Sequence, residues 1–328
     1  MKAKQRTLLV LVALAALAAA ALWWLTAQNE AAEQAESAAE AGTIPLSRVT
    51  ADTLSQIVID YGGETLTIDY ADGAWTLAED PEYHLDTTTC NTMLTNLSEL
   101  NAKRELTQQA GEDYGLDAPQ ATVTVTADGE TRTIIFGAEN TVTGDLYVQT
   151  SDSDAVYTVD SAKLGSFEVT KADLFGAFQP AGLTSSDIEG IEYTLADGET
   201  VALTARSEPA ADSTEDAESS SYETVWRLAS DPEAELDETA VDDLVAAVSS
   251  YVAGQITDAD PAAYGFAKPL AVYRITTADG TVTMRYASGT GGYYMMVDGD
   301  DSVYSIDTQT IAALLHTASD YLADDTAA

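Results

Sequence analysis

The chain has few of the side chains that most often carry chemistry. Its 328 residues include one cysteine, Cys90, and two histidines, His84 and His316. A single cysteine excludes an intramolecular disulfide, so hydrophobic cores must stabilise the fold. The two histidines lie far apart in the sequence, without a Cys pair or a His-x-x-x-His spacing, and this favours structural or surface roles over a metal site.

Basic residues are also scarce. The sequence has 14 Lys and Arg against 55 Asp and Glu, which gives a formal net charge of −41. Binding to nucleic acid or to anionic lipid headgroups requires Lys and Arg to neutralise phosphates, so this composition excludes both. The acidic composition indicates a solvated surface and specifies no partner.

One long hydrophobic run is present, over residues 8–25. At ~1.5 Å per residue a helix of this length covers about 27 Å, enough to cross the hydrocarbon core of a membrane. Lys2, Lys4 and Arg6 precede the run, so we expect an inside N-terminus and export of everything after it. A cleaved signal peptide is the alternative, but its apolar region is usually only ~7–15 residues.

Behind this anchor the sequence predicts an Ala/Glu-rich spacer over residues 26–50 and two repeats, over 51–180 and 183–324. The repeats share about a dozen landmarks at matching spacing, and such self-similarity indicates two copies of one module. The landmarks of the first are Trp75, Asp80-Pro81-Glu82, Leu85-Asp86, Tyr114-Gly115, Pro119, Asp128-Gly129, Tyr147, Val156-Tyr157 and Asp160. Those of the second are Trp226, Asp231-Pro232-Glu233, Leu236-Asp237, Tyr264-Gly265, Pro269, Asp279-Gly280, Tyr294, Val303-Tyr304 and Asp307.

Each repeat alternates strand-like segments with one amphipathic helix. Apolar residues recur at three- and four-residue intervals after Asp86 and Asp237, which are candidate N-caps. The predicted class is α+β, with an antiparallel sheet whose apolar face packs against the helix. The expected strands are 57–59, 65–70, 74–77, 121–126, 131–136, 146–149 and 155–159, then 188–195, 200–205, 224–228, 271–277, 281–286, 293–297 and 302–306.

The repeats differ most at residues 207–221, SEPAADSTEDAESSS. This stretch lacks aromatic and large aliphatic side chains, so it cannot bury a core. We expect a disordered loop between two strands of the second repeat.

Three loop motifs resemble ligand sites. Residues 288–292 are glycine-rich but lack the Gly-Lys-Ser/Thr ending of a phosphate loop, and this favours a hairpin. Asp298-Gly299-Asp300-Asp301 and Asp152-Ser153-Asp154 could offer oxygens to Ca²⁺, but neither has the spacing of a calcium loop, which favours turns. No Gly-x-Ser-x-Gly elbow is present in the sequence, although triads can assemble from distant positions.

The Tyr114-Gly115-Leu116 and Tyr264-Gly265-Phe266 segments, each followed by a proline, are the sharpest local signature. Glycine permits a sharp turn, proline fixes the next backbone angle, and the aromatic ring fills the junction. The structural interpretation is favoured over ligand binding, which stays the alternative.

The landmarks of the first repeat, above all Tyr114-Gly115-Leu116-Asp117-x-Pro119, resemble a bacterial family known as domain of unknown function 4340. In the second repeat this element changes to Tyr264-Gly265-Phe266-Ala267-Lys268-Pro269, so the first copy is the better match. The resemblance implies an accessory role beside ABC transporters of the gliding-motility type. It supplies no catalytic residues.

We therefore expect a non-enzymatic, single-pass protein of the bacterial cytoplasmic membrane, with extracytoplasmic modules that act as a scaffold or accessory, for example of an ABC transporter. No catalytic, cofactor-binding or metal-binding residue is predicted, and no cofactor. The first alternative is an extracellular module that binds a glycan or peptide through Tyr293 and Tyr294 or a cleft. The second is a cell-envelope hydrolase using carboxylates of raised pKa.

Overall fold

The computed structural model describes residues 44–106, 112–209 and 222–323. They form two compact units, one of residues 44–79 and 87–174 and one of residues 80–86 and 175–323. The predicted span over 8–25 and the spacer up to residue 43 lie outside the described residues. Among the helices that are described, none has the length and apolar character needed to cross a membrane.

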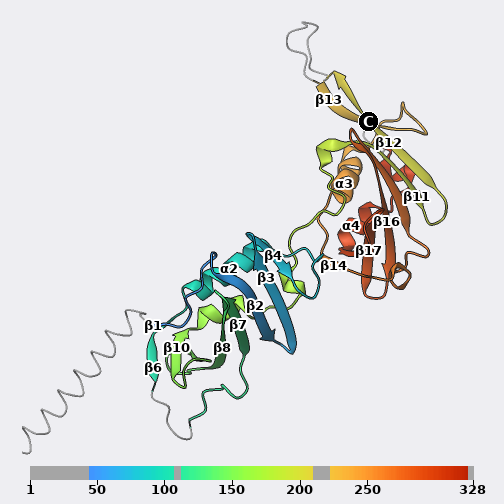
Figure 1. The fold of residues 1–328 in the computed structure, drawn as a ribbon. Helices are drawn as coiled ribbons and strands as arrows, with labels where there is room; N and C mark the ends of the chain where they lie inside the picture. The colour runs from blue at the N-terminus through green and yellow to red at the C-terminus, as the bar shows by residue number, and fades with distance from the viewer. Residues whose placement is uncertain (1–43, 107–111, 210–221, 324–328) are drawn as a thin grey trace, which may run out of the picture. The chain divides into compact units, whose positions relative to one another are not determined.

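An eight-stranded antiparallel sheet forms the first unit, in the order β4-β3-β2-β7-β8-β9-β10-β6 (Figure 1). A second, two-stranded sheet pairs β1 with β5. The strands are β1 (Ile44–Pro45), β2 (Leu54–Tyr61), β3 (Glu64–Ala71), β4 (Ala74–Leu77), β5 (Asn101–Ala102), β6 (Arg104–Leu106), β7 (Ala121–Ala127), β8 (Glu130–Glu139), β9 (Asp145–Thr150) and β10 (Val156–Asp160).

The core of this unit follows from the hydrophobic pattern. In β2, Ile57 and Ile59 are fully buried while their neighbours Gln56, Val58 and Asp60 are at least partly exposed, as the two-residue period of a strand requires. Helix α2 (Thr87–Ser98) buries Cys90, Met93 and Leu97, so the predicted amphipathic helix is confirmed. Short 3₁₀ helices η1 (Ser161–Ser166) and η2 (Ala172–Leu174) follow the last strand.

The second unit repeats this sheet strand for strand, in the order β13-β12-β11-β15-β16-β17-β18-β14. Asp237 caps α3 (Glu238–Val248) by accepting the backbone N–H of Thr239 at 2.9 Å, so this predicted N-cap is confirmed. The other elements are η3 (Ser185–Asp187), β11 (Ile188–Leu195), β12 (Thr200–Pro209), β13 (Tyr222–Leu228), β14 (Gly254–Ile256), η4 (Pro261–Tyr264), β15 (Ala271–Thr277), β16 (Gly280–Gly289), β17 (Gly292–Val297), β18 (Val303–Ile306), α4 (Thr308–Ala313) and η5 (Ala318–Tyr321).

By content the described chain is mostly β. The tandem antiparallel sheets that the sequence predicts are confirmed, but helices are few and short, so the balance lies further toward strand than an α+β assignment implies. The identical strand order of the two sheets shows that the repeated landmarks mark a repeated backbone.

The predicted loop over 207–221 is wrong at its first residues. Ser207, Glu208 and Pro209 continue β12 and pair with residues 222–224 of β13. Backbone pairing between two adjacent strands needs no large apolar side chain, so the polar composition of this stretch gives no signal for a strand. Residues 210–221 lie outside the described part of the chain.

The segment of residues 80–86 belongs to the second unit, although it lies within the first sequence repeat. Leu85 forms a β-bridge with Phe175, and the backbone N–H of Gly176 donates to the His84 carbonyl at 2.9 Å. The amide oxygen of Gln255, on β14, accepts the His84 backbone N–H at 2.8 Å. The second unit therefore includes a segment that precedes α2 in the sequence.

Candidate functional site

In the second unit His84 and the acidic loop at Asp300 lie around one pocket of about 460 Å³. The His84 ring stacks on Phe178 with 4.3 Å between ring centroids, and this pair forms an aromatic side of the pocket. The remaining lining residues are Glu82, Gln255, Gly299, Asp300, Asp301, Ser302 and Tyr304. The structure thus brings together two features that the sequence offers separately.

Hydrogen bonds fix the polar side of this pocket. The Tyr304 hydroxyl donates to Asp300 Oδ2 at 2.6 Å, and Asp300 Oδ1 accepts the Ser302 backbone N–H at 2.8 Å. Burial raises the pKa of the Tyr304 hydroxyl, which therefore stays a donor at physiological pH. The Gln255 amide donates to the Glu82 carbonyl and to Ser302. Because Asp300 is already occupied within its own loop, the turn interpretation of residues 298–301 fits the structure.

Metal binding finds no geometric support here. In residues 44–106, 112–209 and 222–323, no three His, Cys, Asp or Glu side chains are placed to hold an ion together. What the pocket offers instead is an imidazole, three carboxylates and an aromatic side, a combination suited to a small polar or cationic ligand.

His316 lines a different pocket, together with Asp243, Ser250 and Asp307. Its ring packs edge-on against Tyr321 at 5.6 Å, and its backbone carbonyl accepts the Tyr193 hydroxyl at 2.7 Å. Its Nδ1 atom is buried and has no hydrogen-bond partner within the described ranges. The backbone and ring contacts give His316 a role in packing.

The remaining loop motifs form turns. Residues 288–292 join β16 to β17 as a hairpin, in which the Thr290 carbonyl accepts the Tyr294 hydroxyl at 2.9 Å. At the other acidic motif, Asp152 pairs with Arg132 at 2.7 Å, and a hydrogen bond with Thr150 lowers the Asp152 pKa. The predicted hairpin and turns therefore agree with the structure.

The two Tyr-Gly motifs have equivalent packing roles. Tyr114 contacts Tyr147 edge-on at 5.0 Å, and Tyr264 contacts Tyr294 in the same way at 4.9 Å. Gly265 has a φ of 90°, and a Cβ there would clash with the Ser288 carbonyl oxygen. Each motif therefore closes a tight contact between a turn and the sheet, as the structural interpretation predicts.

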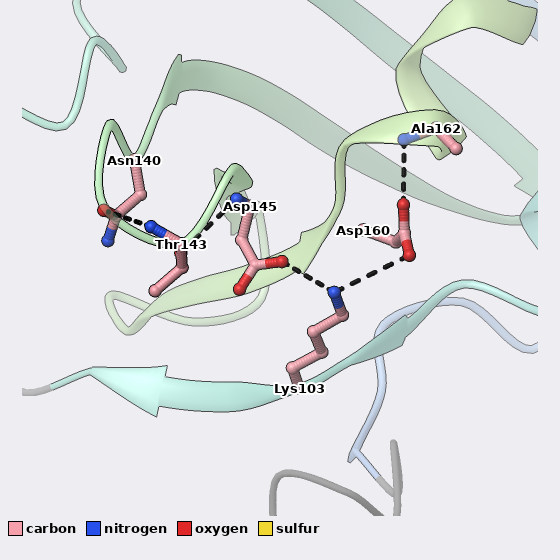
Figure 2. Close-up of polar contacts among 6 residues, drawn as sticks. All are labelled: Lys103, Asn140, Thr143, Asp145, Asp160 and Ala162. Carbon is pink, nitrogen blue, oxygen red and sulfur yellow. Dashed lines mark hydrogen bonds and ion pairs between the residues drawn. The ribbon is translucent and has the colours of Figure 1, made fainter.

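A lysine cluster in the first unit is absent from the sequence predictions. Figure 2 shows the Lys103 ammonium group between two carboxylates, 2.6 Å from Asp145 and 3.6 Å from Asp160. The hydrogen bond with Asp145 raises the pKa of Lys103, and the Ala162 backbone N–H, which Asp160 caps, lowers the pKa of Asp160. The cluster joins the Lys103 segment before β6 to the ends of β9 and β10. Sequence offers no signal for it, because the three residues meet only through strand pairing.

The two equivalent tryptophans, Trp75 and Trp226, differ in their surroundings. The Trp75 indole lies 4.4 Å from the Tyr70 ring and donates to the Asn91 amide oxygen at 3.0 Å. Trp226 lines two neighbouring pockets of about 840 and 620 Å³. Both indoles are half-buried, but Trp75 is held by a neighbouring ring and a hydrogen bond, whereas Trp226 lines two pockets.

A family model described as "Domain of unknown function (DUF4340)" matches residues 75–269 and 226–327. The two matches together cover most of the chain, which therefore belongs to this family. They begin at the equivalent residues Trp75 and Trp226, as expected of a tandem repeat. Comparisons with curated proteins and with solved structures returned no match.

Proposed function

We propose that this chain is a non-enzymatic scaffold or accessory protein of the bacterial cytoplasmic membrane. The apolar run 8–25 anchors it, the two units lie outside the membrane, and its partner is a membrane complex of the ABC transporter type. The observation that carries this proposal is that shared landmarks pack, turn or cap: Asp160 and Asp307 cap helices, and Tyr114 and Tyr264 fill equivalent junctions. The residues that the two repeats share therefore maintain a structural framework.

The orientation can be tested with one engineered cysteine. Val142 is 90% exposed, whereas the natural Cys90 is fully buried. A membrane-impermeant maleimide should label a Val142→Cys variant in spheroplasts and leave the natural chain unlabelled. Labelling that requires lysis would contradict the exported orientation.

Partnership with a transporter is tested by purifying the tagged full chain from gently solubilised membranes. We expect an ATPase and a permease subunit to be isolated with it in reproducible proportion. A version that begins at residue 26 is the control for the contribution of the anchor. Repeated isolation of the full chain alone would contradict the accessory role.

The second candidate function is binding of a small extracellular ligand. Tyr294 is only 8% exposed and its hydroxyl is bonded within its own hairpin, so this ring does not offer the stacking surface that the glycan alternative requires. The pocket at His84 and Phe178 is the better location for a ligand. Small amines and sugars should raise the Tm of the natural chain and have no effect on a His84→Ala variant, if this pocket binds them.

For the hydrolase alternative, a general acid needs a raised carboxyl pKa. Within the described residues, five aspartates have a lowered pKa instead. They are Asp152, Asp160, Asp173, Asp307 and Asp320.

A further inference from the structure

A replacement between the repeats opens a groove beside Trp226. In the first unit Trp75 pairs across the strands with Tyr70, whose ring packs on the indole. In the second unit Trp226 pairs with Ala205, so a methyl group stands where the first unit has a phenol ring. No hydrogen bond from the Trp226 indole nitrogen is found within the described part of the chain, whereas Asn91 accepts that of Trp75. Without that ring beside it, the half-buried Trp226 indole packs against the core on one side and lines two pockets.

The groove lies between a hairpin and a helix. Its two pockets share Thr224, Trp226 and Asp242, so they form one continuous depression. The β12–β13 hairpin has seven residue pairs, against four in β3–β4. Figure 1 shows this hairpin, in yellow, reaching beyond α3, which contributes Val241, Asp242 and Val245 to the opposite side. The longer hairpin thus extends the sheet face past the helix that covers it.

The groove is strongly acidic. Six carboxylates line it against two guanidinium groups, and Arg227 is already paired with Glu208 at 2.9 Å. A cation placed over the indole would gain both a cation–π interaction and attraction from these carboxylates. The acidic residues are Glu189, Glu208, Glu223, Glu235, Glu238 and Asp242.

The neighbouring strand is suited to pairing with a peptide. β13 is the last strand of its sheet, and the described residues place no further strand beside it. The outer backbone groups of such an edge strand can pair with an added extended segment. Alternate side chains of that segment would then point to the groove side of the sheet.

We propose that this groove binds an extended basic segment of a partner protein, added as a strand to β13. Lys or Arg side chains of the segment lie over the Trp226 indole and among the surrounding carboxylates. The site goes beyond the scaffold function proposed above and does not depend on the membrane anchor or on an ABC transporter as partner. A glycan stacked on Trp226 is the competing occupant.

The test is binding of labelled peptides to the purified full chain in detergent, measured by fluorescence anisotropy. One decapeptide alternates lysine with valine, and its match carries glutamate in place of lysine. We expect the lysine peptide to bind, to weaken as salt rises, and to resist displacement by a soluble cello-oligosaccharide. Absence of binding, equal binding of the glutamate peptide, or displacement by the sugar would overturn the proposal.

Ala205→Tyr separates groove binding from general attraction to an acidic protein. It restores the ring of the first repeat without changing any charge, so the lysine peptide should bind at least about tenfold more weakly. The Tm of this variant should be unchanged or higher. Equal affinity of this variant and the natural chain would place the peptide elsewhere and overturn the proposal.

Two variants that each remove one charge keep the proposal testable if Ala205→Tyr folds poorly. Asp242→Asn, which gives the residue found at Asn91, should weaken the lysine peptide about threefold. Asp279→Asn removes the same charge from an exposed turn outside the groove and should leave affinity unchanged. Equal effects of these two variants would show attraction to net charge alone and contradict the proposed site.

Discussion

The two sheets have the same strand order but different core chemistry. Across equivalent strand pairs, the first unit uses aliphatic residues and a phenylalanine where the second uses tyrosines. Both sets are nearly or fully buried. The corresponding residues are Ile59, Val123 and Phe136 in the first unit and Tyr193, Tyr273 and Tyr286 in the second.

The tyrosine core has directional contacts that an aliphatic core cannot make. Tyr193 donates to the His316 carbonyl and Tyr273 to the Leu314 carbonyl, each at 2.7 Å. Burial raises the pKa of the tyrosine hydroxyls, for Tyr321 to about 12, so they stay protonated donors. The comparison shows that one backbone accepts either chemistry, provided that the buried hydroxyls find acceptors.

The largest effect should come from the glycines that both repeats share. Gly265→Ala would combine a left-handed backbone with a clash against the Ser288 carbonyl, so we expect a loss of about 3 kcal/mol in the free energy of unfolding. Gly198 has a similar φ of 95° but open space around it, so Gly198→Ala should cost only about 1 kcal/mol. Denaturant unfolding measures both. Equal losses would show that the backbone angle alone matters.

The tyrosine contacts of the second unit predict the next effect. Tyr273→Phe leaves the buried Leu314 carbonyl without this donor and should cost about 1–2 kcal/mol. Tyr286→Phe is the control, because its hydroxyl contacts only the weak acceptor Met284 Sδ at 3.7 Å. Hydrogen exchange resolved by segment should show the Tyr273→Phe loss in α4 and η5. A similar loss in both variants would argue against the role of the carbonyl contact.

The helix caps should behave alike in both repeats. Asp160→Ala and Asp307→Ala should each cost about 1 kcal/mol, because each carboxylate accepts a backbone N–H. These N–H groups lower both pKa values below the ordinary 3.8. The contribution is therefore present above pH 3.8 and lost as the pH falls through the lower folded-state pKa. An acid titration of Tm should show this loss in the natural chain and a smaller one in the variants.

The smallest effect should come from the lysine cluster, which is confined to the first unit. In the second unit Ala253 occupies the position equivalent to Lys103, because its backbone N–H makes the equivalent hydrogen bond between strands. Lys103→Ala should cost about 0.5 kcal/mol, because the side chain is 38% exposed and solvent screens its ion pairs. High salt should remove most of the difference in Tm. A loss of Tm that does not depend on salt would indicate a packing role for Lys103 instead. Because the Lys103 pKa is raised in the folded state, the contribution of its ion pairs to stability is present below pH 10.5 and is lost above it.

Much of the fold is predictable from local patterns. β4 and β11 have the predicted bounds, because an Asp-Gly turn precedes β4 and another follows β11. The amphipathic spacing of Cys90, Met93 and Leu97 predicts α2 and its buried face. The edge strands β6 and β14 were missed, since three residues carry too little pattern for a two-residue period to be recognised.

The candidate sites were less predictable. His84 and Asp300 are distant in sequence, and only the docking of residues 80–86 within the second unit brings them to one pocket. The groove at Trp226 depends on which residue pairs with the tryptophan, and this is set by strand register. Register is a long-range property, whereas sequence patterns within one segment report only local structure.

By itself the sequence determined the duplication, the antiparallel modules, the family and the scarcity of chemically active side chains, because these follow from composition and from repeated local signals. Only the tertiary structure decided which unit holds residues 80–86, where Lys103 finds its carboxylates, and that Trp75 packs on a ring while Trp226 lines a pocket. The physical reason is that these features depend on contacts between segments far apart in the chain. The effect of a single replacement, Tyr70 in the first unit and Ala205 in the second, can be recognised only once the strand pairing is known.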